Sequence, residues 1–440
     1  TEGNITTAEI DGSEDLTVRA TQGNVTFGGV LGNAVLLGNL DVNAQSANIN
    51  NIATNTGDIN FSDTLAVVLE SDVLLDTAGA AASGDVLFGN ATIDSDAAGS
   101  IRNLTIRVES AAVAGAVSIG AVGGNVAVGT LTILHEGGAA NDGTITLAGD
   151  ITTDGTVNFD GASDTKISLA DNIVITTTND AVDLGGDADT DLLDGAFSLA
   201  VLAGTGQVDL PLIGSITAPT GLTTTSGVIN ILQDVTVAGP ISMTATGAAD
   251  IDGEIETTGA SGDVGIATIG VFDISIDGNL TASGGIDIAS GKAINIGTAG
   301  TKTVLTAQND LTLAAAGDIL LRTADSDLNS DGGHLVLRGG TDGTGTVDAE
   351  AGTTLSSFLD LTIAGEGAGA MSISGLTSNG SVGISQDDDI SIVGTGISAV
   401  NDISVVSAAA VKVDGNVDSS GGEIFLESDS DNDGVGDPDL

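Results

Sequence analysis

The sequence predicts an all-β protein, a single long parallel β-helix with irregular coils, from two observations. First, a phrase of glycine, any residue, apolar, polar, apolar recurs between residues 23–27 and residues 422–426. Such alternation forms a strand with one buried face, and the leading glycine marks a turn. Second, no stretch of useful length combines helical periodicity with capping residues. Because a strand this short cannot bury its apolar face alone, we expect the copies to stack.

Two strand phrases alternate along the chain. Copies of the glycine phrase begin at Gly23, Gly57, Gly84, Gly143, Gly155, Gly206, Gly227, Gly317 and Gly422. Copies of an apolar-Thr-apolar phrase lie at residues 16–18, 104–106, 131–133, 235–237, 311–313 and 361–363. The gaps between copies are irregular, which predicts corners of variable length. At about 20–25 residues per coil the chain would make about 18–22 coils.

Four glycine phrases end in phenylalanine, and these fix the expected register. We predict that each phenylalanine points into the core and that the residue before it faces outwards. The pairs are Thr26 and Phe27, Asn60 and Phe61, Leu87 and Phe88, and Asn158 and Phe159. Because Trp and Tyr are absent and aromatic residues make up only 2% of the chain, the rest of the core should be aliphatic.

Three of the four prolines lie close together, at Pro211, Pro219 and Pro240. Proline cannot donate a hydrogen bond to a strand ladder. We therefore expect a bulged loop, a bend or a change of coil size at residues 211–225.

The charge of the chain limits its partners. It has 61 acidic and 9 basic residues and a formal net charge of -52 at pH 7. This excess argues against nucleic acid and against anionic membrane surfaces, because both are bound through Lys and Arg. Carboxylates at this density call for salt or divalent cations, and calcium, which prefers oxygen ligands, is the expected cofactor. Adaptation to a salt-rich cytosol is the competing explanation.

Residues 111–134 are uncharged and long enough to suggest a membrane span. However, they contain several glycines and keep a period of two, which favours stacked strands. We expect no membrane insertion.

The end of the chain carries alternate aspartates in a turn-forming context. Residues 429–437 read DSDNDGVGD, which resembles the calcium motif of thrombospondin type-3-like repeats. The resemblance implies that Asp429, Asp431, Asp433 and Asp437 bind calcium. We therefore divide the chain into a β-helix at residues 1–426 and an acidic calcium-motif tail or junction at residues 427–440. A disordered acidic tail is the alternative.

The repeats themselves resemble those of a known class of surface protein. Residues 16–29 read LTVRATQGNVTFGG, which is similar to the repeats of filamentous-haemagglutinin-type proteins, and the likeness extends over most of residues 1–426. The resemblance implies a right-handed parallel β-helix that is exported to the bacterial surface. It also implies a role as a fibrous adhesin or an extracellular structural protein.

An enzyme is the less favoured interpretation. Many β-helices process acidic polysaccharides, but such enzymes use aromatic platforms and clustered charged side chains. Here the nine basic residues are scattered, and an anionic glycan would be repelled. The two histidines, His135 and His334, have no motif around them and are expected at the surface or at corners. We predict no catalytic residues and no organic cofactor.

The sequence therefore favours a secreted or cell-surface structural protein. Neither end of the repeat region shows an amphipathic helix or another distinct cap. Either the segment is cut from a longer repeat array, or its ends pair with neighbouring copies. We favour the second explanation and expect the chain to stack end to end into filaments. Cell-surface or matrix polysaccharide is a possible partner. The alternatives are an adhesin and, less favoured, a polysaccharide-processing enzyme.

Overall fold

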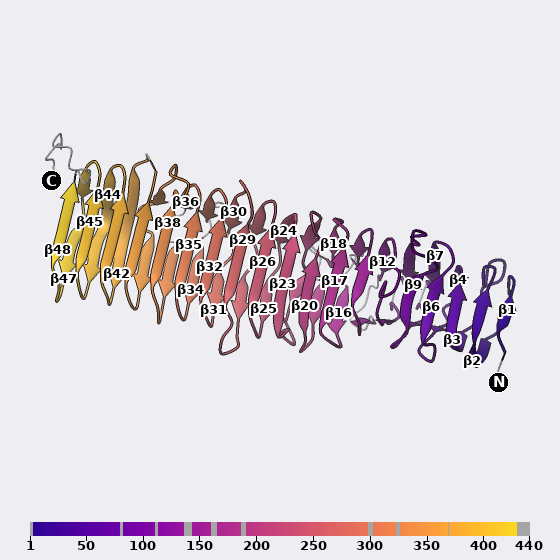
Figure 1. Ribbon diagram of the computed structural model, residues 1–440. Coiled ribbons are helices and arrows are strands. Elements are labelled where there is room, and N and C mark those ends of the chain that lie inside the picture. Colours follow the sequence, from indigo (N-terminus) through magenta and orange to yellow (C-terminus); the bar gives the residue numbers. More distant parts are fainter. Residues whose placement is uncertain are drawn as a thin grey trace. The chain divides into compact units, whose positions relative to one another are not determined.

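The computed structural model describes residues 3–79, 82–110, 113–135, 143–159, 165–185, 191–297, 302–322, 326–367 and 369–428. These residues contain strands and no helix, and the strands stack in parallel as a β-solenoid of about 17 turns. The prediction of an all-β parallel β-helix is confirmed. The chain separates into two compact units, Thr1–Gly227 and Val228–Leu440. Figure 1 shows the strands in the order of the sequence.

The first unit contains three stacks of parallel strands, and β2 (Leu16–Phe27) and β3 (Leu40–Ile49) each contribute to two of them. One stack adds β1 (Ile5–Thr7), β6 (Ala66–Leu69), β9 (Thr92–Ser95), β14 (Ile151–Thr153), β17 (Ile173–Thr177), β20 (Ser198–Leu202) and β23 (Gly221–Ser226). The next adds β5 (Ile59–Asn60), β8 (Val86–Leu87), β11 (Val117–Ile119), β13 (Ile145–Leu147), β16 (Lys166–Leu169), β19 (Leu192–Asp194) and β22 (Leu212–Ile213). The third comprises β4 (Ile52–Ala53), β7 (Val73–Asp76), β10 (Leu104–Arg107), β12 (Leu131–Leu134), β15 (Val157–Asn158), β18 (Val182–Asp183) and β21 (Gln207–Asp209).

The second unit repeats this plan, with one stack built from strands of five residues that we call the broad sheet. Figure 1 shows these strands side by side. They are β26 (Ile241–Ala245), β29 (Val264–Thr268), β32 (Ile286–Ser290), β35 (Leu311–Ala315), β38 (Leu335–Gly339), β41 (Leu361–Gly365), β43 (Val382–Gln386), β45 (Ile403–Ser407) and β48 (Ile424–Ser428).

The other two stacks of the second unit share β42 (Met371–Ser378) and β44 (Ile390–Ala399). One adds β24 (Val228–Ile231), β27 (Ala249–Ile251), β30 (Ile274–Ile276), β33 (Ile294–Ile296), β36 (Ile319–Leu321), β39 (Val347–Ala349) and β46 (Val411–Val413). The other adds β25 (Val235–Val237), β28 (Ile255–Thr257), β31 (Leu280–Ala282), β34 (Val304–Ala307), β37 (Asp327–Ser330), β40 (Thr354–Ser357) and β47 (Asn416–Ser419).

Coil length varies strongly while strand register is kept. Hydrogen-bonded residues on neighbouring coils are 19 positions apart at Asn39 and Asp58, and 31 apart at Asp85 and Ala116. The irregular coils are therefore as predicted. The predicted number of 18–22 coils was too high. Several corners are long, so some coils contain more than the 20–25 residues that the prediction assumed.

The core follows the predicted register. Phe27, Phe61, Phe88 and Phe159 are fully buried, and the residue before each is only half-buried on the outer side of its strand. The rings of Phe61 and Phe88 stack with their centroids 5.6 Å apart. Because these two residues lie on successive coils, the stacked rings continue the side-chain column from one coil to the next. The remaining buried apolar residues are Val, Ile, Leu and Ala, with two Met.

The clustered prolines all lie outside strands, as their missing donor requires. Pro211 immediately precedes β22, Pro219 lies just before β23, and Pro240 immediately precedes β26. The expected loop lies between β22 and β23, where Ile216 is 80% exposed. No helix among the described residues is long and apolar enough to cross a membrane.

Candidate functional site

The corners of the solenoid carry side chains that bind the backbone of the next coil. In the second unit the residue immediately before each broad-sheet strand forms a column, which we call the capping column. Asp263 Oδ1 accepts a hydrogen bond from Gly285 N at 2.7 Å, and Asp310 Oδ1 accepts one from His334 N at 2.8 Å. Each carboxylate therefore satisfies a backbone donor that the turn leaves without a strand partner.

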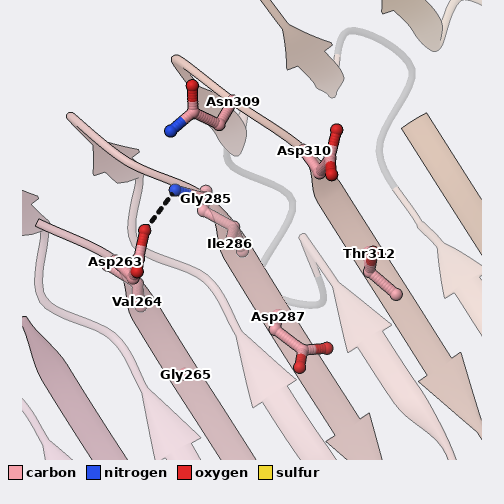
Figure 2. A pocket seen from close by; sticks show the side chains of 9 residues that line it. All are labelled: Asp263, Val264, Gly265, Gly285, Ile286, Asp287, Asn309, Asp310 and Thr312. Atoms are coloured by element: carbon pink, nitrogen blue, oxygen red, sulfur yellow. Dashed lines mark hydrogen bonds between the residues drawn. The ribbon is translucent and has the colours of Figure 1, made fainter. Parts of the chain in front are cut away.

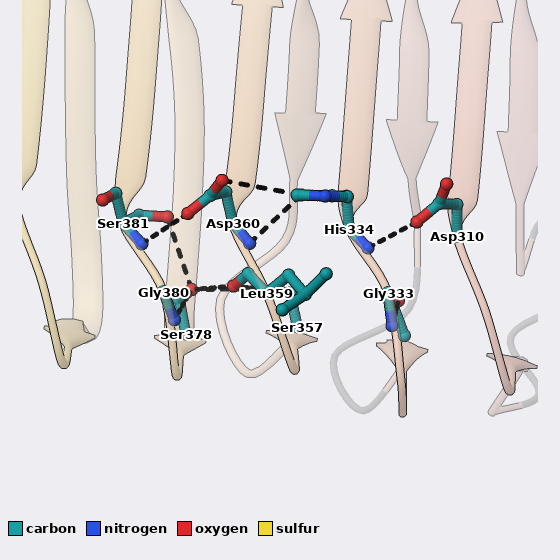
Figure 3. Close-up of polar contacts among 10 residues, drawn as sticks. Asp310, Gly333, His334, Ser357, Leu359, Asp360, Ser378, Gly380 and Ser381 are labelled. Carbon is teal, nitrogen blue, oxygen red and sulfur yellow. Dashed lines mark hydrogen bonds and ion pairs between the residues drawn. The ribbon is translucent and has the colours of Figure 1, made fainter.

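Figure 3 follows this column through three further residues. His334 Nδ1 accepts from Asp360 N at 3.2 Å, and Asp360 Oδ1 accepts from Ser381 N at 2.9 Å. The same imidazole nitrogen lies 3.6 Å from Asp360 Oδ2. His334 thus lies at a corner, as predicted, and acts as one member of the column. His135 also lies at a corner, directly after β12, but its side chain is fully buried.

A hollow lies on the broad sheet beside the capping column (Figure 2). We call it the acidic hollow; it has a volume of about 520 Å³. It exists because two outward positions carry no side chain: a Cβ on Gly265 would meet only Ile241 O, at 3.8 Å, and a Cβ on Gly285 would lie 3.1 Å from Asp310 O. Its lining residues are Asp263, Val264, Gly265, Gly285, Ile286, Asp287, Asn309, Asp310 and Thr312.

The chemistry of the acidic hollow is that of a hydrogen-bond acceptor. Asp263 and Asp310 each use Oδ1 for the capping column, and Oδ2 of each carboxylate accepts no hydrogen bond from the residues that the structure describes. Asp287 is exposed on the strand face and makes no hydrogen bond or ion pair with the described residues. No lining residue is a cation, a thiol or an imidazole. The hollow therefore suits a ligand that donates hydrogen bonds or carries positive charge.

A second, smaller pocket lies where β42 and β44 bend between their two stacks. It has a volume of about 220 Å³ and is lined by Gly352, Thr353, Thr354, Ser374, Gly375, Thr377, Gly394 and Thr395. The hydroxyl of Thr353 is buried and has no hydrogen-bond partner among the described residues. Because an unsatisfied buried hydroxyl is costly, this pocket has the chemistry of a water site.

The few cations are mostly bound to aspartates. Seven of the nine basic residues form ion pairs: Arg19 with Asp41, Arg102 with Asp96, Arg107 with Asp76, Lys292 with Asp273, Lys302 with Asp327, Arg322 with Asp348, and Lys412 with Asp414. In the part of the chain that the structure describes, Lys166 and Arg338 have no such partner.

Ion pairing and burial shift four pKa values. Hydrogen bonds from Arg102 lower the pKa of Asp96, and those to Asp96 and Asp76 raise the pKa values of Arg102 and Arg107. Burial raises the pKa of Asp250, and the nearby charges of Asp252 and Asp277 raise it further.

The predicted calcium ligands Asp429, Asp431, Asp433 and Asp437 lie outside the described residues. Within the described ranges, no group of three or more His, Cys, Asp or Glu side chains is arranged to hold a metal ion. Sequence reasoning also missed the acidic hollow. Its carboxylates come from separate coils, and the only local signal is a pair of glycines at the start of neighbouring strands, Gly265 and Gly285.

Comparison of the chain with family models, with curated proteins and with solved structures finds no match.

Proposed function

We propose that this protein is a non-catalytic structural β-solenoid of an extracellular fibre or matrix, and that its copies stack end to end. One observation supports the proposal: a side chain of the core column is exposed on β48, the last strand that the structure describes. Ile424 continues the column of Ile403, its register partner on β45. Ile403 is fully buried, whereas Ile424 is 47% exposed. A further coil from a second copy, placed on β48, would cover this apolar side chain and extend the parallel strand ladder.

The chemistry of the described surface supports a role without catalysis. The acidic hollow has carboxylates but no histidine, lysine or cysteine, and the side chains of the smaller pocket between β42 and β44 offer only hydroxyl groups. Side-chain hydrogen bonds join neighbouring coils at the corners beside both pockets. Such a surface is suited to assembly rather than to turnover.

Substitution of the open coil tests end-to-end stacking. Ile424→Asp combined with Leu426→Asp places charges where the next coil would pack, and it should abolish filaments seen by electron microscopy while the circular dichroism spectrum stays β-rich. Phe358→Asp is the matched control, because Phe358 is 52% exposed at a corner rather than on the last described strand. Normal filaments from the double variant would refute the proposal.

We further propose that calcium binds at Asp429, Asp431, Asp433 and Asp437 and clamps the junction. Ion binding to the native state alone would raise its stability. Calcium should therefore raise the melting temperature at low ionic strength, and a chelator should reverse the effect. Asp431→Asn with Asp433→Asn should remove most of this response. An equal response in the variant and the parent would place the ion elsewhere.

One observation favours an adhesin as the second candidate. The turn after β29 exposes Ile269, Val271 and Phe272, and Val271 is 76% exposed. Apolar and aromatic side chains at a protruding corner are typical of a recognition surface. Val271→Ser with Phe272→Ser should then reduce adhesion to surface polysaccharide without affecting filament formation. Unchanged adhesion would argue against this candidate.

A further inference from the structure

The outer face of the broad sheet is nearly free of charge, in contrast to the whole chain. From β26 to β45 its outward positions carry small or hydroxyl side chains and valine, with two charged exceptions, Asp287 and Arg338. These positions are Ser242, Thr244, Gly265, Ala267, Asp287, Ala289, Thr312, Ala314, Val336, Arg338, Thr362, Ala364, Gly383, Ser385, Ser404 and Val406. Because the net charge is -52, most other approaches of two copies are opposed by repulsion.

Arg338 is the basic residue on the outer face of the broad sheet, and it forms no ion pair with the described residues. It is exposed on β38, and it makes no ion pair with the described residues although seven other basic residues do. Its register neighbours are Ala314 on β35 and Ala364 on β41. The guanidinium therefore projects above a shallow surface of small side chains, where nothing within the same face neutralises it.

The acidic hollow lies on the same face and has the complementary charge. It is centred on β29, β32 and β35, whereas Arg338 lies on β38. A guanidinium donates five hydrogen bonds and prefers carboxylates. Gly265 and Gly285 leave room for a long side chain, and Asp287 offers a carboxylate without a partner.

We propose that a second copy of this chain docks face to face on the broad sheet, with Arg338 of each copy inserted into the acidic hollow of the other. A twofold axis along β35 places β38 of one copy over β32 of its partner, and the relation is reciprocal. The strands of the two copies then run in the same direction, whereas the coils of one copy advance in the opposite direction to those of the other.

The offset and the area agree with this arrangement. Arg338 is in register with Ala289, through Ala314, and Ala289 is two positions from Asp287, about 6.6 Å along the strand. An extended arginine spans such a gap.

The area of the face also agrees with this arrangement. The strands from β26 to β43 cover about 34 by 16 Å, so that docking would bury a total of about 1,100 Å² on the two copies. This is near the lower limit for a specific interface, so the dimer should depend on protein concentration.

The inference goes beyond end-to-end stacking and does not depend on it. To separate the two, sedimentation velocity is run in the Ile424→Asp, Leu426→Asp background, over a range of protein concentrations at physiological ionic strength, where the overall repulsion is screened. We expect a reversible dimer. Arg338→Asp and Asp287→Arg should each weaken dimerisation at least tenfold, because each sets like charges against one another.

The charge swap provides the decisive measurement. Arg338→Asp combined with Asp287→Arg should restore dimerisation to within a few-fold of the parent. Arg322→Glu is the matched control, because Arg322 pairs with Asp348 outside the broad sheet, and it should leave dimerisation unchanged. A monomeric parent, an unaffected Arg338→Asp variant, or a double swap as weak as the single variants would each overturn the proposal.

Discussion

The corners and the strand faces of this solenoid have different chemistry. Corners carry the hydrogen-bonding side chains: in the first unit, Asn39 N binds Asp15, Asp58 N binds Asn39, Asp85 N binds Asp58, and Ala116 N binds Asp85. The outer faces of the strands carry many Thr, Ser, Ala and Asn side chains, together with aspartates such as Asp41 and Asp76 that form ion pairs. Asparagine serves as well as aspartate in this series. Backbone capping therefore explains why Asx residues lie at corners, but it does not require their charge.

The largest expected loss of stability comes from a substitution in the core, compared with the same substitution at a corner. Phe88→Ala should lower the free energy of unfolding of the first unit by about 3–5 kcal/mol, because it leaves a cavity beneath the Phe61 ring. Phe358→Ala, at an exposed corner, should change that of the second unit by less than about 0.5 kcal/mol. Denaturant unfolding measures both. Similar losses would mean that burial does not distinguish the two places.

Glycine gives a sharper contrast within the second unit. A Cβ on Gly278, at a corner, would lie 1.9 Å from Gly253 O, whereas one on Gly383, on a strand face, would meet nothing within 4 Å. Gly278→Ala should therefore cost about 1–3 kcal/mol. Gly383→Ala should be neutral or stabilise by up to about 1 kcal/mol. If the two melting temperatures moved together, close corner packing would not be the constraint.

The capping role predicts a smaller effect. Asp85→Ala removes the acceptor of Ala116 N and should cost about 1 kcal/mol. Asp85→Asn keeps an acceptor oxygen, as Asn39 does two turns of the column earlier, and should cost little or even stabilise at low salt. Thermal unfolding at low and high salt separates the hydrogen bond from the charge. Equal losses in both variants would show that the charge matters more than the acceptor.

The smallest effect is a pH dependence on a strand face. Burial and the charges of Asp252 and Asp277 raise the pKa of Asp250 in the folded protein. A raised carboxyl pKa means that the folded state binds the proton more tightly, so this group opposes folding above its folded pKa. Asp250→Asn should therefore raise the melting temperature at pH 7. The gain should shrink as the pH falls through the raised pKa of the folded protein, and it should vanish below the ordinary carboxyl pKa of the unfolded chain. A gain that is constant with pH would exclude this cause.

The sequence was sufficient for the strands and their buried faces, but not for the acidic hollow. Alternation is local, so Thr26, Phe27 and their counterparts could be assigned to opposite faces from five residues at a time. The hollow depends on which residues of different coils become neighbours. Gly265 meets Asp287, and Asp287 meets Thr312, only because of the particular lengths of two intervening corners. The number of residues in each corner depends on the conformation of its turns. Because glycine and aspartate fit several types of turn, the sequence does not determine these conformations.

The unequal coils have a consequence for how the chain folds. Each strand pairs with strands on adjacent coils, and the described coil-to-coil separations of 19 and 31 residues are small beside 440 residues. Relative contact order is then about 0.06, just below the range of helical bundles and far below that of most β proteins. Each new coil also adds onto a completed one, so folding can start at any coil and spread to its neighbours. A nascent chain could therefore fold as it emerges, without waiting for its other end.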